Sequence, residues 1–206
     1  MIYSGGEKAE RGVAVLLDKQ VRQAVKEVDC CSDRPMVVRL SGRPVDIVVI
    51  IVYMPTSDQP DEEVEDVYDK IEEKVASCKG KDYVLVLGDM NATAGNEKIL
   101  NVTGNYGLGN RNTRGEMLVD FCMRNNLTLT NTLFKNNQRR RQRYKTSVKN
   151  SCSYPGADVG SDHNLVIMKV DLKMKMVAKA KVIQKWNKDQ LITEKEMIFL
   201  RQPTMN

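Results

Sequence analysis

Three short stretches of the chain place polar side chains where an apolar run ends or begins. Gly88-Asp89-Met90-Asn91 follows the apolar run 83–87, so a carboxylate and an amide two positions apart come directly after a predicted buried strand. The carboxylate can hold or polarise a water molecule, and the amide can orient it by hydrogen bonding. Asp and Asn after a strand are also common turn residues. The stretch is a candidate catalytic site, and an ordinary turn is its alternative.

The second stretch, Gly160-Ser161-Asp162-His163, precedes the apolar run 165–172 and contains the only histidine of the chain. Imidazole can carry a proton near neutral pH or donate a hydrogen bond to a phosphate oxygen. The adjacent carboxylate of Asp162 is an oxygen ligand of the kind that divalent cations prefer. The alternative is a surface loop with an incidental acid and imidazole pair.

The third stretch, Tyr53-Met54-Pro55, closes the longest apolar run. Its phenol could donate a hydrogen bond to a phosphate, or it could be a core tyrosine at the end of a strand. Because all three stretches lie at the edges of predicted buried strands, two packed sheets would give them a common rim. The side chains expected at this rim are Tyr53, Asp89, Asn91, Asp162 and His163.

Hydrophobic periodicity predicts the elements that position these side chains. Apolar, β-branched runs predict strands, and the turn 42–44 between two of them predicts an antiparallel hairpin. An apolar stripe at helical spacing predicts an amphipathic helix, and period-two alternation predicts a half-exposed strand at 127–133. The predicted strands are 12–17, 36–41, 45–53, 83–87, 127–133 and 165–172, and the predicted helices are 61–78 and 114–125.

Grouped strands with only two clear helices favour two packed sheets flanked by helices over an alternating β/α barrel. The expected fold class is α/β, a two-sheet αββα sandwich. We expect one domain over residues 1–172, followed by a basic, polar C-terminal extension over residues 173–206.

Composition narrows the class of protein. Hydrophobic residues make up 41% and charged residues 29% of the 206 residues, as in ordinary globular proteins. The polar start of the chain and its short apolar runs predict neither a signal peptide nor a membrane span. Five cysteines without a C-x-x-C pair argue against a disulfide framework and a structural zinc site. We therefore expect an intracellular protein, nuclear or cytoplasmic, without a membrane partner.

The formal charge of +5 is compatible with a polyanionic partner. The densest basic cluster could contact phosphates without reading sequence, and a solvated loop is its alternative. Its residues are Arg139, Arg140, Arg141, Arg143 and Lys145.

Together, the three stretches resemble motifs of the endonuclease/exonuclease/phosphatase family. Residues 88–91 are similar to its G-D-x-N motif, residues 161–163 to its S-D-H motif and residues 53–55 to its Y-x-P motif. Further stretches look like retroelement-type endonucleases and craniofacial development protein 2-like sequences. These stretches are 52–57, 106–116 and 154–158, and the resemblance covers residues 3–172.

The resemblance implies hydrolysis of a phosphodiester, or in some branches a phosphomonoester, with Mg²⁺ or Mn²⁺. Asp89 would position and activate the attacking water, and Asn91 would help orient the water or the phosphate. Asp162 would contribute to the metal site together with Asp89. His163 would stabilise charge on the phosphoryl oxygens, and Tyr53 would contact the phosphate. The expected partner is nucleic acid, and DNA is the preferred kind.

The chain departs from the family pattern in two places. It begins after the strands that carry a metal-site Asn and a metal-ligand Glu, and the stretch 144–154 is shorter than in the family, without its Thr-Trp and Asp-Tyr-Ile segments. These absences predict weaker metal binding and a less well oriented His163. We therefore expect weak or absent catalysis. Three functions stay open: a metal-dependent nuclease, an inactive nucleic-acid-binding remnant, and a partly folded product of a degenerate element.

Overall fold

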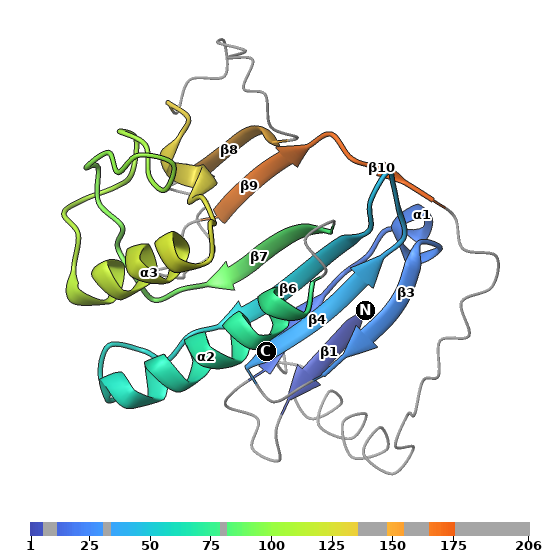
Figure 1. The fold of residues 1–206 in the computed structure, drawn as a ribbon, viewed down its shortest axis with the longest axis horizontal. Helices are drawn as coiled ribbons and strands as arrows, with labels where there is room; N and C mark the ends of the chain where they lie inside the picture. The colour runs from blue at the N-terminus through green and yellow to red at the C-terminus, as the bar shows by residue number, and fades with distance from the viewer. Residues whose placement is uncertain (6–11, 31–33, 79–81, 136–147, 155–164, 176–206) are drawn as a thin grey trace, which may run out of the picture.

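The computed structural model describes residues 1–5, 12–30, 34–78, 82–135, 148–154 and 165–175. Within them lie ten strands, three helices and one 3₁₀ turn (Figure 1). The strands are β1 (Ile2–Gly5), β2 (Gly12–Val15), β3 (Val25–Asp29), β4 (Pro35–Leu40), β5 (Gly42–Arg43), β6 (Ile47–Tyr53), β7 (Tyr83–Asp89), β8 (Val148–Tyr154), β9 (Leu165–Val170) and β10 (Lys173–Met174). The helices are α1 (Lys19–Arg22), α2 (Asp61–Ser77) and α3 (Thr113–Arg124), and the 3₁₀ turn is η1 (Thr130–Thr132).

The central sheet has four strands in the order β3-β4-β6-β7. The β4–β6 pair is antiparallel, which confirms the hairpin predicted around residues 42–44. Strand β7 is parallel to β6, because α2 carries the chain back to the start of the sheet between them. The carboxyl ends of β6 and β7 therefore meet at one edge of the sheet.

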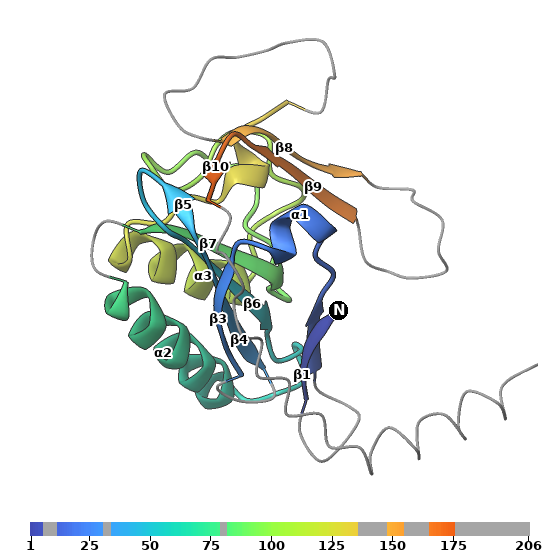
Figure 2. The same cartoon turned by 90° about the vertical axis from the view of Figure 1, so that its right-hand side faces the viewer.

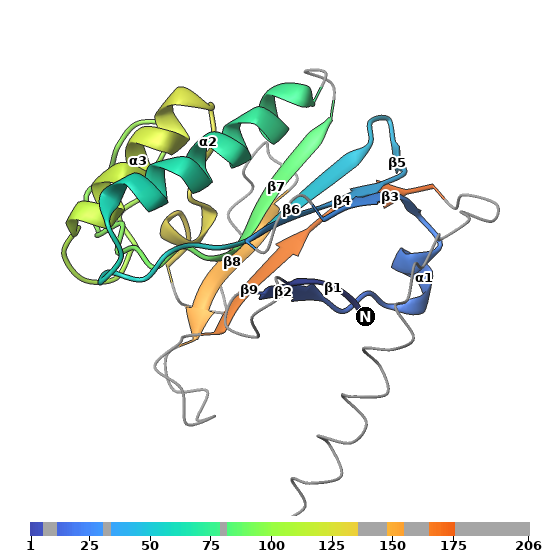
Figure 3. The same cartoon turned by 90° about the horizontal axis from the view of Figure 1, so that it is seen from below.

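Strand β6 lies between two apolar layers. Val48, Ile50 and Val52 pack into a core with α2 and α3, whereas Ile47 and Ile51 pack into a second core with Val13 and Val25. Successive side chains of a strand point to opposite faces, so an uninterrupted apolar run can serve both cores. Figures 2 and 3 show this layering, with the two long helices on one side of the sheet and the β1–β2 hairpin on the other.

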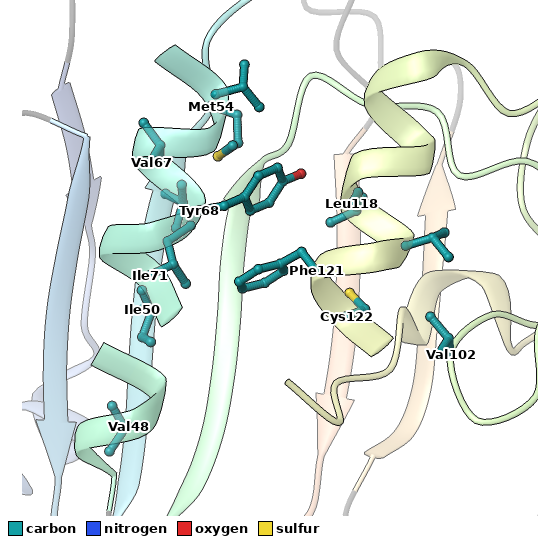
Figure 4. Packing of buried hydrophobic residues seen from close by; sticks show 13 residues of the cluster. Val48, Ile50, Met54, Val67, Tyr68, Ile71, Val102, Leu118, Phe121 and Cys122 are labelled. Carbon is teal, nitrogen blue, oxygen red and sulfur yellow. The ribbon is translucent and has the colours of Figure 1, made fainter. Parts of the chain in front are cut away.

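The core on the helix side is centred on two aromatic rings, as Figure 4 shows. The rings of Tyr68 in α2 and Phe121 in α3 stack with their centroids 4.7 Å apart. Cys122 is also buried there, and burial raises the pKa of its thiol to about 12. This thiol is therefore protonated at neutral pH and belongs to the packing. The apolar stripe of the predicted helix 61–78 is confirmed as buried at Val64, Val67 and Ile71.

The strand predicted at 127–133 is wrong, although its period-two pattern has a physical basis. Leu127 and Leu129 do pack against the core. The backbone instead closes α3, because Leu127 N–H donates to Cys122 O at 2.8 Å while Asn126 adopts a φ of 52°. The hydroxyl of Thr132 then donates to Leu129 O at 2.6 Å, which favours the 3₁₀ turn.

Strands β8 and β9 form an antiparallel pair that bonds to no other strand among the described residues. Several sheets and few helices make this a mixed α/β fold, consistent with the predicted sandwich in an incomplete form. In the part of the chain that is described, no helix has the length and apolar character needed to span a bilayer.

Candidate active-site rim

The carboxyl ends of β6 and β7 bring two of the predicted site residues together. In the parallel register Tyr53 pairs with Asp89. Beyond the strands, Met54 N–H donates to Asp89 O at 2.9 Å, so the two chains stay joined where they leave the sheet. Residues that are 36 positions apart in sequence therefore become immediate neighbours at one edge of the sheet.

Asn91 links both strands in a tight turn. Its backbone N–H donates to Asp89 Oδ1 at 2.9 Å, and its side-chain Nδ2 donates to Met54 O at 2.8 Å. A φ of 45° makes this geometry possible, and Asn tolerates such a backbone better than most residues. The turn therefore holds the Asp89 carboxylate through Oδ1 and the Asn91 side chain through Nδ2. The turn that the sequence offered as an alternative is therefore present, and its hydrogen bonds hold both side chains.

Gly88 allows the two strands to approach each other at the rim. Its φ is 139°, a conformation that side chains rarely permit. A Cβ atom at this position would lie 1.8 Å from Val52 O. The glycine of the motif is therefore required by the close contact between β6 and β7 directly before Asp89.

Arg34 contacts both the backbone and the ring of Tyr53, which the sequence did not indicate. Its Nη1 donates to Tyr53 O at 3.3 Å, and its Nη2 binds Glu63 Oε1 at 2.8 Å. The guanidinium also lies 5.9 Å from the centroid of the Tyr53 ring, within cation–π range. The side chain of Arg34 is only 8% exposed. It is a positioning residue, and a single arginine before a strand carries no pattern that would have revealed it.

The chain that follows Asn91 is tied to the start of α3. Asn112 Oδ1 accepts hydrogen bonds from Gly115 N at 2.8 Å and from Thr93 N at 3.1 Å. Asn112 N–H donates in return to Thr93 O at 3.2 Å. One side chain therefore caps the helix and holds the loop that begins at the rim.

Replacing Asn112 with alanine is expected to lower the free energy of unfolding by about 1–2 kcal/mol, because the helix cap and the loop contact are lost together. Urea titration followed by circular dichroism measures the change. Asn112→Asp keeps the accepting oxygen and should retain most of the stability. Equal losses in both variants would show that the cap does not contribute in this way.

Other predicted site residues lie outside the described residues. These are Asp162 and His163 of the second stretch and the whole basic cluster Arg139, Arg140, Arg141, Arg143 and Lys145. Among the predicted site residues, the structure brings Tyr53, Asp89 and Asn91 together.

The oxygen donors at the rim are the carboxylate of Asp89 and the amide of Asn91. Within the described ranges no group of three or more His, Cys, Asp or Glu side chains is arranged to hold a metal. Mg²⁺ is commonly bound through one or two carboxylates, with water and substrate phosphates completing its shell. The described part of the rim therefore supplies one carboxylate and one amide oxygen to any such ion.

Two curated proteins are similar to the chain over most of its length. It is 36% identical over 200 residues to craniofacial development protein 2 of Bos taurus, covering 86% of this chain and 34% of that protein. It is 34% identical over 200 residues to craniofacial development protein 2 of Tragulus javanicus, covering 86% of this chain and 35% of that protein. The chain is a homologue of part of these proteins. It spans about a third of their length, and no protein-family profile matches it.

Proposed function

We propose that this chain is a divalent-metal-dependent phosphodiester hydrolase that acts on nucleic acid. DNA is its preferred substrate, and its turnover is slow. We also propose that it is a partial domain of the endonuclease/exonuclease/phosphatase type, related to retroelement endonucleases. The observation that carries the proposal is the hydrogen-bonded unit of Asp89, Asn91 and Met54 beside Tyr53. The name of the relatives states no activity, so the proposal depends on this rim and on the motifs.

We assign each residue at the rim a role that the chemistry of its side chain allows. The carboxylate of Asp89, held by Asn91 N–H, accepts a proton from an attacking water. The amide of Asn91 orients that water or a phosphate oxygen, and the phenol of Tyr53 donates to the phosphate. A bound Mg²⁺ or Mn²⁺ would neutralise the phosphate and the leaving group. Asp162 would add a second carboxylate for the metal, and His163 would stabilise charge on the phosphoryl oxygens.

Metal dependence tests the proposal. Supercoiled plasmid incubated with the full chain in Mg²⁺ or Mn²⁺ should be nicked slowly, and EDTA should stop the reaction. Gel separation of supercoiled, nicked and linear forms measures the rate. A chain that shows a cooperative unfolding transition but nicks nothing in either metal would contradict the hydrolase.

An inactive nucleic-acid-binding protein is the second candidate, favoured by the charge of +5 and the basic cluster around residues 139–145. Its signature would be binding without turnover, with an affinity that falls steeply as salt rises. Each phosphate contact contributes about −0.9 to the slope of log K against log salt on duplex DNA. The same protein preparation can be tested for both behaviours.

A further inference from the structure

A groove of about 460 Å³ lies where the loop after β7 meets η1. In Figure 1 this loop and η1 lie together, apart from the central sheet. The volume of the groove falls in the range of about 300–1,000 Å³ that is usual for small-ligand sites. The lining residues belong to the loop that starts at Asn91 and to the segment after α3. They include Lys98, Asn101, Gly104, Asn105, Tyr106 and Thr128.

The floor of the groove is held by hydrogen bonds between its two segments. Gly104 N–H donates to Thr132 Oγ1 at 2.8 Å, and Tyr106 N–H donates to Thr132 O at 3.0 Å. Thr128 Oγ1 donates to Asn101 O at 2.7 Å. A Cβ atom at Gly104 would lie 2.3 Å from Thr132 O, so only glycine permits this contact. The groove is therefore preformed.

The walls offer side chains whose polar groups are not used within the fold. Lys98, Asn101, Asn105 and Tyr106 make no side-chain hydrogen bond or ion pair with any other described residue. Tyr106 is 43% exposed. None of the described residues that line the groove carries a carboxylate, so Lys98 gives this lining a positive charge.

These groups together match one ligand chemistry. A tyrosine ring gives a stacking surface for a base, and side-chain amides can pair with the donor and acceptor groups of a base edge. A lysine attracts a phosphate. Inside a duplex, neighbouring bases cover the base faces and the partner strand covers the pairing edges, so these groups could not all be used. The ligand that satisfies all of them is a nucleotide whose base is unpaired.

We propose that this groove binds an unpaired nucleotide of a single-stranded segment, with the base on Tyr106, its edge at Asn101 and Asn105, and a phosphate at Lys98. The inference rests on the proposed function, because the bound strand would be the one presented to the rim at Asp89. The part of the loop that forms the groove packs against the part that begins at Asn91. A Cβ atom at Gly107 would lie only 1.8 Å from Gly95 O, which shows how close the two parts are.

Binding in EDTA tests the groove without cleavage. Fluorescence anisotropy with labelled oligothymidylate should show that Tyr106→Ala weakens binding by about 5- to 150-fold. Tyr106→Phe should bind like the unchanged chain. Tyr3→Ala is the matched control, because Tyr3 is 50% exposed but lies in β1. Lys98→Gln should reduce the slope of log K against log salt by about 0.7 on this single-stranded probe.

Competition experiments identify the source of the nucleotide. Unlabelled oligothymidylate should displace the probe, whereas blunt duplex and free thymidine monophosphate should compete only at much higher concentrations. Equal affinity of Tyr106→Ala and the unchanged chain for oligothymidylate would contradict the proposed nucleotide site. Tight binding of thymidine monophosphate without binding of oligothymidylate would contradict it as well. Plasmid that is never nicked, together with binding that is lost in Tyr106→Ala, would reject the hydrolase alone. Nicking with no effect of Tyr106→Ala on binding would reject the groove alone.

Discussion

Asp89→Asn is expected to lower the rate of plasmid nicking by about 10²- to 10⁴-fold, the usual effect of removing a general base. The amide of asparagine keeps an oxygen that can accept the hydrogen bond from Asn91 N–H, so the turn at the rim should survive. It cannot accept a proton from water, and it is a poorer ligand for a divalent cation. The rate should therefore fall while the free energy of unfolding changes little.

The matched control is Asp120→Asn, which removes a carboxylate from the exposed side of α3. Nicking rates under saturating Mg²⁺ and urea midpoints are measured for both variants and the unchanged chain. The control should nick at the rate of the unchanged chain. An unaltered nicking rate in Asp89→Asn would remove Asp89 from the chemistry and with it the proposed hydrolase.

Gly88→Ala is expected to destabilise the fold by more than about 4 kcal/mol, a size that only severe changes reach. The new Cβ atom would lie 1.8 Å from Val52 O and 2.9 Å from Val52 N, so β6 and β7 must separate. The positive φ adds strain of its own. Because the separation occurs directly before Asp89, the rim should be displaced as well.

Gly109→Ala separates backbone strain from collision. Gly109 also has a positive φ, of 65°, but the nearest atom to its added Cβ would be Thr93 Cγ2 at 3.6 Å, an ordinary contact. This variant should lose only about 1–2 kcal/mol. Urea titration measures both. Comparable losses would mean that the contact with Val52 relaxes without cost.

The elements with strong periodicity could be predicted from the sequence. The strands around 45–53 and 83–87 and the helix at 61–78 are confirmed, since their apolar patterns also specify which faces are buried. The strand expected at 127–133 was wrong because two leucines pack inward from a backbone that has no strand partner. Strands β1, β3 and β8 were not predicted, since their short runs are interrupted by polar residues.

The candidate site was predictable only where strand ends supply it. Tyr53 and Asp89 each follow an apolar run, so their meeting at one sheet edge could be expected. The contribution of Met54 O could not, because a backbone carbonyl has no signature in sequence. Arg34 was missed for a similar reason: its importance comes from burial against Tyr53, which only the tertiary structure defines.

The packing of β6 against two apolar cores restricts its opening motions. Its side chains alternate between two cores, so a fluctuation that frees this strand must disrupt both layers at once. The free energy of such an opening approaches that of global unfolding. Tyr53 and the carbonyl of Met54 that anchors Asn91 therefore follow a strand that cannot open without disrupting both cores.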